Sequence, residues 1–231
     1  MADRSYRWLL WTLVLVGALA DQGSKYGVFR WLYPDRCPAS QERALLSGSE
    51  AGVTFSHDAD GSKVQYMVVP GVFRFFTQFT NQPEAPEHVL APLRTWSAPL
   101  LPRVNQGALF GLGGDYKAHA NTVFAMVSVA AALAIIFWST RPSTARDWTL
   151  CLALGLILAG TLGNLYDRLI FNGVRDFLYF FWIEWPIFNV ADCCLVCGAS
   201  LLLLQAFWSR PAHEKQQTSE TALAAATATR P

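Results

Sequence analysis

The sequence has few charged residues and no surplus of either sign. Asp, Glu, Lys and Arg make up only 15% of the 231 residues, whereas a soluble domain carries about 25%. The 18 Lys and Arg barely exceed the 17 Asp and Glu, so the positive charge that binds phosphate groups is missing. We therefore expect no nucleic-acid partner, and the composition argues against a soluble or wholly disordered chain.

Cysteine is also scarce, and its placement predicts no disulfide framework. Four of the five Cys lie in apolar stretches, and only Cys37 lies in a long polar segment. Cys194 and Cys197 have the spacing of a metal-binding pair, but neither a second pair nor a His partner accompanies them. We interpret the Cys of the apolar stretches as small apolar residues.

What the sequence does contain is long apolar runs, because 52% of its residues are hydrophobic. A helix needs about 20 mostly apolar residues to cross a bilayer. Four stretches reach this length, and only the first carries several charges, at its far end. The fold class we predict is an all-α membrane protein with four transmembrane helices, at about residues 8–32, 118–138, 148–166 and 187–208.

The first stretch has a second interpretation. Arg4 and Arg7 precede an apolar run that ends in Ala18-Leu19-Ala20, which is typical of a secretory signal peptide and its cleavage site. Aromatic and apolar residues resume after Asp21, and this favours a retained helix. A mature protein that starts at Asp21 would contradict the four-helix prediction.

The remaining segments complete a single membrane-embedded domain, residues 1–210. The extracytoplasmic segment 33–104 is polar, and within it 63–80 predicts two short strands joined by a turn at Pro70-Gly71. Residues 81–102 are rich in Pro and predict irregular structure. The Ala- and Thr-rich tail 211–231 predicts disorder.

The distribution of Lys and Arg predicts the orientation. These residues are denser in 1–7, 139–147 and 209–231 than in the long segment 33–117. Short basic loops stay in the cytoplasm, so we expect both termini there and the segment 33–104 outside.

With this orientation, the polar residues of the predicted spans gather at the outer face of the membrane. They form groups at helical spacing: Asp21 with Lys25, Asn164 with Asp167 and Arg168, and Asn189 with Asp192. Ionisable residues inside a membrane usually face a bundle interior and mark a functional site. We interpret Asp21 and Lys25 as a structural ion pair.

The carboxylates suggest acid–base chemistry. Asp192 has no basic residue within one helical turn, so it needs a partner from elsewhere or a proton. Two close carboxyl groups in a site of low dielectric constant share a proton and can act on water. Asp176 lies in a short returning loop and is the candidate partner; the residues leave Asp167 open as an alternative, although Asp167 could instead pair with the adjacent Arg168.

Five segments in series resemble the motifs of the signal peptidase II (lipoprotein signal peptidase) family. They are 21–25 (DQGSK), 105–111 (NQGALFG), 163–168 (GNLYDR), 173–177 (GVRDF) and 188–192 (FNVAD). The resemblance implies an aspartyl peptidase of the bacterial inner membrane with its active site near the outer face. It would cut prolipoproteins just before a diacylglyceryl-modified cysteine, and its partners would be these precursors and membrane lipid.

The resemblance also implies a role for each matching residue. Asp176 and Asp192 would be the catalytic pair, with the assignment of acid and base left open. Asn105, Gly107, Asn164, Asp167, Arg168, Asn189 and Ala191 would bind substrate or support the site, and Asp21 and Lys25 would be structural. The resemblance implies no metal and no cofactor, and we expect a monomer.

Two departures from the family pattern stand out. The segment before Asn105 is longer than usual, and we interpret the extra residues as a surface insertion. The position before Asp176 is usually apolar but is Arg175 here, and a cation beside the catalytic pair would lower the pKa of Asp176.

A transporter or proton channel is the rival interpretation, because intramembrane Asp and Asn also mark ion pathways. A path across the membrane would need polar residues in the inner halves of the helices as well. In the second and fourth spans these halves are almost wholly apolar, which argues against a continuous path.

Overall fold

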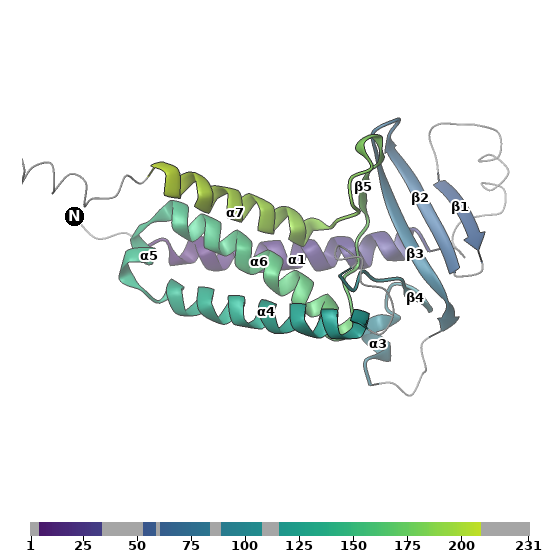
Figure 1. Ribbon diagram of the computed structural model, residues 1–231, viewed down its shortest axis with the longest axis horizontal. Helices are drawn as coiled ribbons and strands as arrows, with labels where there is room; N and C mark the ends of the chain where they lie inside the picture. The colour runs from purple at the N-terminus through teal and green to yellow at the C-terminus, as the bar shows by residue number, and fades with distance from the viewer. Residues whose placement is uncertain (1–4, 34–52, 59–60, 84–88, 108–115, 209–231) are drawn as a thin grey trace, which may run out of the picture.

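The computed structural model describes residues 5–33, 53–58, 61–83, 89–107 and 116–208. Four long helices form a bundle, and a small antiparallel sheet covers one end of it (Figure 1). The long helices are α1 (Arg7–Trp31), α4 (Tyr116–Ser139), α6 (Trp148–Phe171) and α7 (Val190–Trp208). The short helix α5 (Pro142–Arg146) lies at the end opposite the sheet, together with the start of α1 and the end of α7 (Figure 1).

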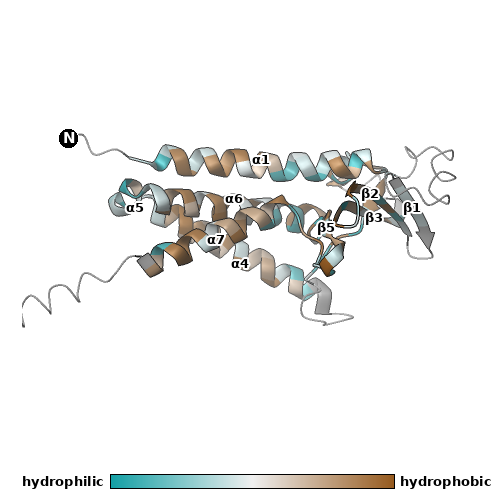
Figure 2. Ribbon diagram, turned by 90° about the horizontal axis from the view of Figure 1, so that it is seen from above, coloured by the Kyte–Doolittle hydropathy of each residue, from teal (hydrophilic) through white to brown (hydrophobic). Residues whose placement is uncertain are grey.

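Three of these helices are long and apolar enough to cross a membrane. The qualifying segments are His119–Ser139, Trp148–Phe171 and Val190–Phe207. Figure 2 shows apolar residues along α4, α6 and α7, whereas polar residues interrupt α1 toward the sheet. The prediction of apolar membrane helices is therefore confirmed for three of the four predicted spans.

Helix α6 is the centre of the bundle, and α1, α4 and α7 all pack against it. Small residues allow this close approach, as is usual between membrane helices. A Cβ atom on Gly160 would lie 2.3 Å from the carbonyl oxygen of Ala191, and one on Gly163 would lie 2.5 Å from Oδ2 of Asp21. These two glycines let α6 contact the backbone of α7 and a buried carboxylate of α1.

The half of the bundle away from the sheet is filled by apolar side chains. Leu10 and Val14 of α1, Ile135 of α4 and Leu158 of α6 are buried in one cluster there. A second apolar cluster, which includes Phe29 and Phe79, joins α1 to the sheet. Along α1, the buried Asp21 and Lys25 lie between Val14 of the first cluster and Phe29 of the second.

The sheet has five strands, and its order is β1-β2-β3-β4 with β5 also paired to β3. The strands are β1 (Val53–Asp58), β2 (Gly61–Val69), β3 (Phe73–Pro83), β4 (Leu100–Pro102) and β5 (Leu178–Phe180). Strands β2 and β3 confirm the predicted hairpin around Pro70-Gly71. Because β5 lies between α6 and α7 in the chain, the sheet is joined directly to the loop that carries Asp176.

Several boundaries differ from the sequence-based predictions. Helix α6 continues to Phe171, five residues past the predicted end, and α7 begins at Val190 and not at 187. The segment 81–102 is not wholly irregular, because it holds the end of β3, the short helix α3 (Ala91–Arg94) and β4. The tail 211–231, Cys37 and parts of the segment 33–104 fall outside the described residues.

Candidate active site

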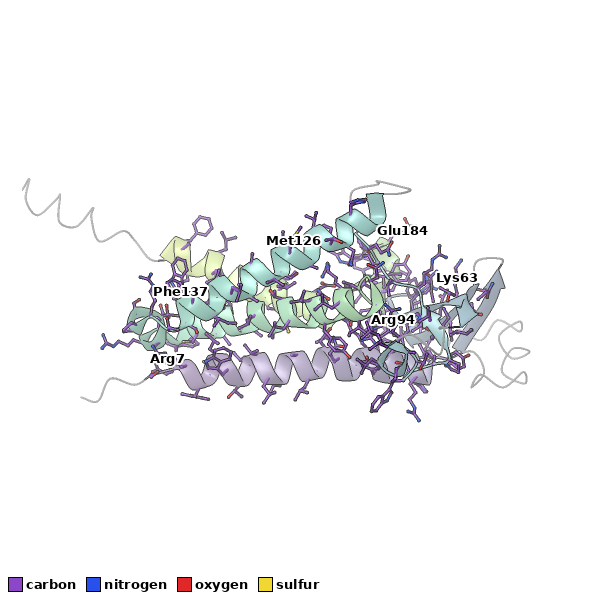
Figure 3. All side chains as sticks on the ribbon, turned by 90° about the horizontal axis from the view of Figure 1, so that it is seen from below. Arg7, Lys63, Arg94, Met126, Phe137 and Glu184 are labelled. Atoms are coloured by element: carbon purple, nitrogen blue, oxygen red, sulfur yellow. The ribbon has the colours of Figure 1, made fainter. Side chains whose placement is uncertain are left out.

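A cavity of about 950 Å³ opens where the bundle meets the sheet. Figure 3 shows this end crowded with side chains, near the labelled Arg94, Glu184 and Lys63 and far from Arg7 and Phe137. Residues from α4, α6, α7, β3 and the connecting loops line it: Phe76, Gln78, Arg103, Val104, Asn105, Gly107, Phe124, Asn164, Arg168, Val174, Asp176, Trp185, Pro186, Ile187, Phe188 and Asp192. Among the described residues of this lining, Asp176 and Asp192 are the only carboxylates.

Asp192 is held by the start of helix α7. Asn189 precedes the helix, and its Oδ1 accepts a hydrogen bond from the backbone N–H of Asp192 at 3.1 Å. In return, Oδ2 of Asp192 accepts from the backbone N–H of Asn189 at 3.1 Å. This reciprocal pair is a capping box, which satisfies two N–H groups that a helix start leaves free. The spacing of Asn189 and Asp192 therefore marks the helix boundary as well as the site.

Asp176 is held by an extended segment that follows α6. Val174 pairs with Asn105 through two backbone hydrogen bonds of 2.8 and 2.9 Å. Two asparagine amides then donate to the Asp176 carboxylate: Nδ2 of Asn105 to Oδ2 at 3.1 Å, and Nδ2 of Asn189 to Oδ1 at 2.7 Å. Residues from two other parts of the chain thus fix this carboxylate.

Asparagines also connect the two carboxylates to each other. Nδ2 of Asn164 donates to Oδ1 of Asp192 at 2.8 Å, and Nδ2 of Asn189 donates to Oδ1 of Asn164 at 3.2 Å. Because Nδ2 of Asn189 also donates to Oδ1 of Asp176, the side chains of Asn164 and Asn189 together link the two carboxylates. The structure therefore brings Asp176 and Asp192 into one hydrogen-bonded site, and Asp167 does not line the cavity.

The carboxyl group of Asp176 holds a proton at higher pH than an ordinary Asp does. Burial raises the pKa of Asp176 to about 7, and the negative charge of Asp192 adds to this rise. The hydrogen bonds from Asn105 and Asn189 act in the opposite direction, because they stabilise the charged form. At neutral pH the pair can therefore hold one proton, as two neighbouring carboxyl groups with different surroundings do.

A second charged cluster lies buried beside the pair. Nζ of Lys25 lies 2.8 Å from Oδ2 of Asp21 and 3.4 Å from Oδ2 of Asp167, and all three side chains are fully buried. The cluster touches the site at two points. Nζ of Lys25 donates to Oδ1 of Asn164 at 3.3 Å, and the backbone N–H of Ala191 donates to Oδ1 of Asp21 at 2.9 Å.

The partners of Arg168 and Arg175 differ from the sequence-based interpretation. Asp167 pairs with Arg175 at 2.8 Å and not with its neighbour Arg168. Arg168 donates from Nη1 to the carbonyl oxygen of Asn164 at 3.2 Å and lies over the ring of Phe124. Arg175 makes its ion pair with Asp167, and the net pKa of Asp176 is raised by burial, with Asn105, Asn189 and Lys25 acting against the rise.

The remaining residues implied by the resemblance are at or next to the cavity. Gly107 lines it and has a φ of 106°, a conformation that favours glycine. Its N–H donates to Oδ1 of Asn105 at 2.9 Å, which orients the Asn105 amide toward Asp176. Ala191 is fully buried.

Sequence reasoning missed Gln22 as part of the buried cluster. Nε2 of Gln22 donates to Oδ2 of Asp21 at 2.9 Å and to the carbonyl oxygen of Gly163 at 3.0 Å, and its Oε1 accepts from Arg175. The available signal was that Gln22 is a polar residue in a predicted span, next to Asp21.

The cysteines of α7 are less buried than expected. Cys151 of α6 is buried, but Cys193 and Cys197 are exposed on the helix surface. Among the described residues, no group of three or more His, Cys, Asp or Glu side chains is placed to hold a metal ion.

These features define a membrane protein in which two carboxyl groups meet in one cavity at the end of a helix bundle, the arrangement that general acid–base chemistry uses. The chain belongs to the signal peptidase II family. The profile of that family, described as signal peptidase (SPase) II, matches residues 80–208.

Relatives named lipoprotein signal peptidase share sequence with this chain. Identity is 46% over 119 residues for the protein of Rhodopirellula baltica, 37% over 107 for that of Aeromonas hydrophila and 34% over 113 for that of Pseudomonas aeruginosa. The alignments cover 45, 46 and 48% of this chain and 51, 64 and 66% of the relatives. The chain thus matches between half and just under two thirds of their length.

Two solved structures described as bacterial membrane enzymes share the fold. The first has a TM-score of 0.56 and 18% sequence identity, and the alignment covers 91% of this chain and 99% of the solved chain. The second has a TM-score of 0.55 and 20% sequence identity, and the alignment covers 90% of this chain and 92% of the solved chain.

Proposed function

We propose that this chain is an aspartyl endopeptidase that removes signal peptides from prolipoproteins by cutting before a diacylglyceryl-modified cysteine. The observation that carries the proposal is the joint hydrogen bonding of Asp176 and Asp192 through Asn189, in a cavity near the ends of membrane helices. The names of the relatives support the choice of substrate.

The surroundings of the two carboxylates support different roles. Asp192 takes a proton from water, and the oxygen of that water attacks the carbonyl carbon of the scissile peptide. Asp176, whose pKa is raised to about 7, gives its proton to the carbonyl oxygen. When the tetrahedral intermediate collapses, the C–N bond breaks, Asp192 returns its proton to the amine nitrogen, and the intermediate's hydroxyl proton returns to Asp176.

The cavity suits a substrate that stays partly in lipid. Apolar side chains, among them Phe124, Ile187 and Phe188, share its lining with the two carboxylates. They come from α4 and from the segment before α7, next to surfaces that a bilayer would cover. An acylated cysteine can therefore keep its chains in the bilayer while its peptide bond reaches Asp176 and Asp192.

We further propose that α1 is a fourth span, that both termini are cytoplasmic and that the sheet faces the outside of the inner membrane. Helix α1 has 25 residues and packs against α6 along the bundle. Its outward side carries exposed Trp8, Trp11, Leu15 and Leu19, which suit contact with lipid.

A proton channel is less well supported. The half of the bundle away from the sheet is filled by the apolar cluster that includes Leu10, Val14 and Leu158. A conducting path needs polar groups or water along its length, so the described cavity ends inside the bundle.

The decisive experiment compares two forms of one precursor. We expect the purified full-length chain to release the signal peptide from a diacylglyceryl-modified prolipoprotein and to leave the unmodified form uncut, as judged by mass spectrometry. Efficient cleavage of the unmodified form would contradict the lipid-dependent step. Failure to cleave either form would contradict the proposed function.

The pKa of Asp176 predicts the pH dependence. As the acid, Asp176 must be protonated, so kcat should fall as the pH rises through about 7. Asn105→Ala removes a hydrogen bond that lowers this pKa, so it should move the fall in kcat to higher pH. The control is Glu184→Gln, an exposed carboxylate outside the cavity lining, which should leave the profile unchanged. A shift to lower pH in Asn105→Ala would contradict the assignment.

A further inference from the structure

Arg175 is buried on the opposite side of the chain from Asp176. In the extended segment after α6, Val174 and Asp176 line the cavity, whereas Arg175 and Phe177 are buried at 0% and 1% exposure. Side chains alternate in this way along extended backbone. The side chain of Arg175 is therefore the inner anchor of the segment that presents Asp176.

Three hydrogen bonds attach Arg175 to one carboxylate of α6. Its backbone N–H and Nε donate to Oδ2 of Asp167 at 2.9 and 3.2 Å, and Nη2 donates to Oδ1 at 2.8 Å. Nη2 also donates to Oε1 of Gln22 in α1 at 2.9 Å. The residue directly before Asp176 is thus tied to two helices of the bundle.

Aromatic rings enclose the rest of the guanidinium. Its Cζ lies 4.2 Å from the ring centre of Tyr26 and 4.0 Å from that of Phe171, within the range of cation–π attraction. Nη1 is buried and has no hydrogen-bond partner among the described residues. The planar group therefore has little freedom to turn.

The charge of Arg175 also balances the buried cluster. Asp21 and Asp167 carry two negative charges, and Lys25 supplies one positive charge. Arg175 supplies the second. An apolar residue at this position would leave one buried negative charge without a partner, which is costly inside a protein.

We infer that Arg175 is a positioning residue, which fixes the Asp176 carboxylate by anchoring its backbone to Asp167 and Gln22. The inference rests on the proposed function, because it assigns a residue to the same reaction. A positioning role differs from a role in charge balance alone. Loss of charge balance would affect folding but not the turnover of the folded enzyme.

The test separates these two roles with matched variants of the full-length chain. Arg175→Met should lower the kcat of the folded fraction about 10- to 100-fold with little change in KM, because a displaced catalytic group slows the chemical step. Arg175→Lys keeps the charge but not the paired hydrogen bonds, and should fall between wild type and Arg175→Met. Arg30→Met, an exposed cation of α1, should leave kcat unchanged.

A double variant gives the sharpest comparison. Asp167→Asn with Arg175→Met removes one charge of each sign, so the thermal stability lost in Arg175→Met should return in part while kcat stays low. Recovery of kcat together with stability would overturn the positioning role, and so would a folded Arg175→Met with wild-type kcat.

A crystal structure of Arg175→Met tests the inference apart from cleavage. We expect the hydrogen bonds from Asn105 and Asn189 to Asp176 to be broken or rearranged. If wild type cleaves no precursor but this displacement is seen, the proposed function falls and the positioning of Asp176 stands. If wild type cleaves and Asp176 is unmoved in the variant, the inference falls and the function stands.

Discussion

Asp192→Asn and Asp176→Asn should each lower kcat about 10³-fold, the size of effect expected when a general acid or base is removed. An amide at 192 can still accept the capping hydrogen bond from the N–H of Asn189, but it cannot take a proton from water. An amide at 176 matches the size of the protonated acid and keeps an acceptor for Asn189, but has no acidic proton to give. Both variants should therefore fold and bind the precursor.

The measurement is the rate of signal peptide release, normalised to folded enzyme. Glu184→Gln is the matched control, because Glu184 is an exposed carboxylate outside the cavity lining. If Asp176→Asn and Asp192→Asn both keep the wild-type rate, the two residues are not the catalytic pair. If only one loses activity, the other carboxylate has a supporting role.

Lys25→Met should destabilise the fold more than other single changes to the cations of α1. Without Lys25, the carboxylates of Asp21 and Asp167 remain buried and only Arg175 is left to balance them. Removing one partner from a buried ion pair costs about 3–5 kcal/mol. Asn164 would also lose the donor that holds its Oδ1, so the site would loosen as well.

Denaturant or thermal unfolding in detergent checks this expectation. Arg30→Met is the control, because an exposed cation should change the stability by no more than about 0.5 kcal/mol. Equal stability of Lys25→Met and Arg30→Met would show that Lys25 contributes little. A partial recovery in Lys25→Met with Asp21→Asn is expected, because the buried charges balance again.

The apolar helices could be predicted from the sequence because their apolar runs are long and almost free of charge. The residues at which these helices begin and end could not be predicted. The apolar run continues through Ile187 and Phe188, but Asn189 caps α7, so the helix begins after it. Helix α6 runs past Asp167 because ion pairs with Lys25 and Arg175 stabilise that carboxylate inside the bundle.

Only part of the sheet could be predicted from the sequence, because its short strands depend on pairing with distant residues. Strands β2 and β3 carry enough Val, Phe and Tyr around a Pro-Gly turn to be recognised. Strands β4 and β5 have three residues each, and pairing with β3 defines them as strands. No local pattern predicts a strand that depends on a distant partner.

At the site, the sequence identified the polar residues but assigned some of their partners wrongly. The pairing of Asp167 with Arg168, which the sequence left open, does not form because adjacent residues of a helix point in different directions. Asp167 faces α1 and Arg175, whereas Arg168 faces the cavity. The motifs already implied Asp176 as the partner of Asp192, and the structure adds that Asp167 is engaged by Lys25 and Arg175.

The two carboxylates of the site belong to different bodies of the fold. Asp176 comes two residues before β5, which is bonded to β3, whereas Asp192 is in the first turn of α7. The hydrogen bonds of Arg175 to Asp167 and Gln22, and of Asn189 to Asp176, tie this segment to the helices, so a tilt of the sheet reaches the carboxylates only where these bonds break.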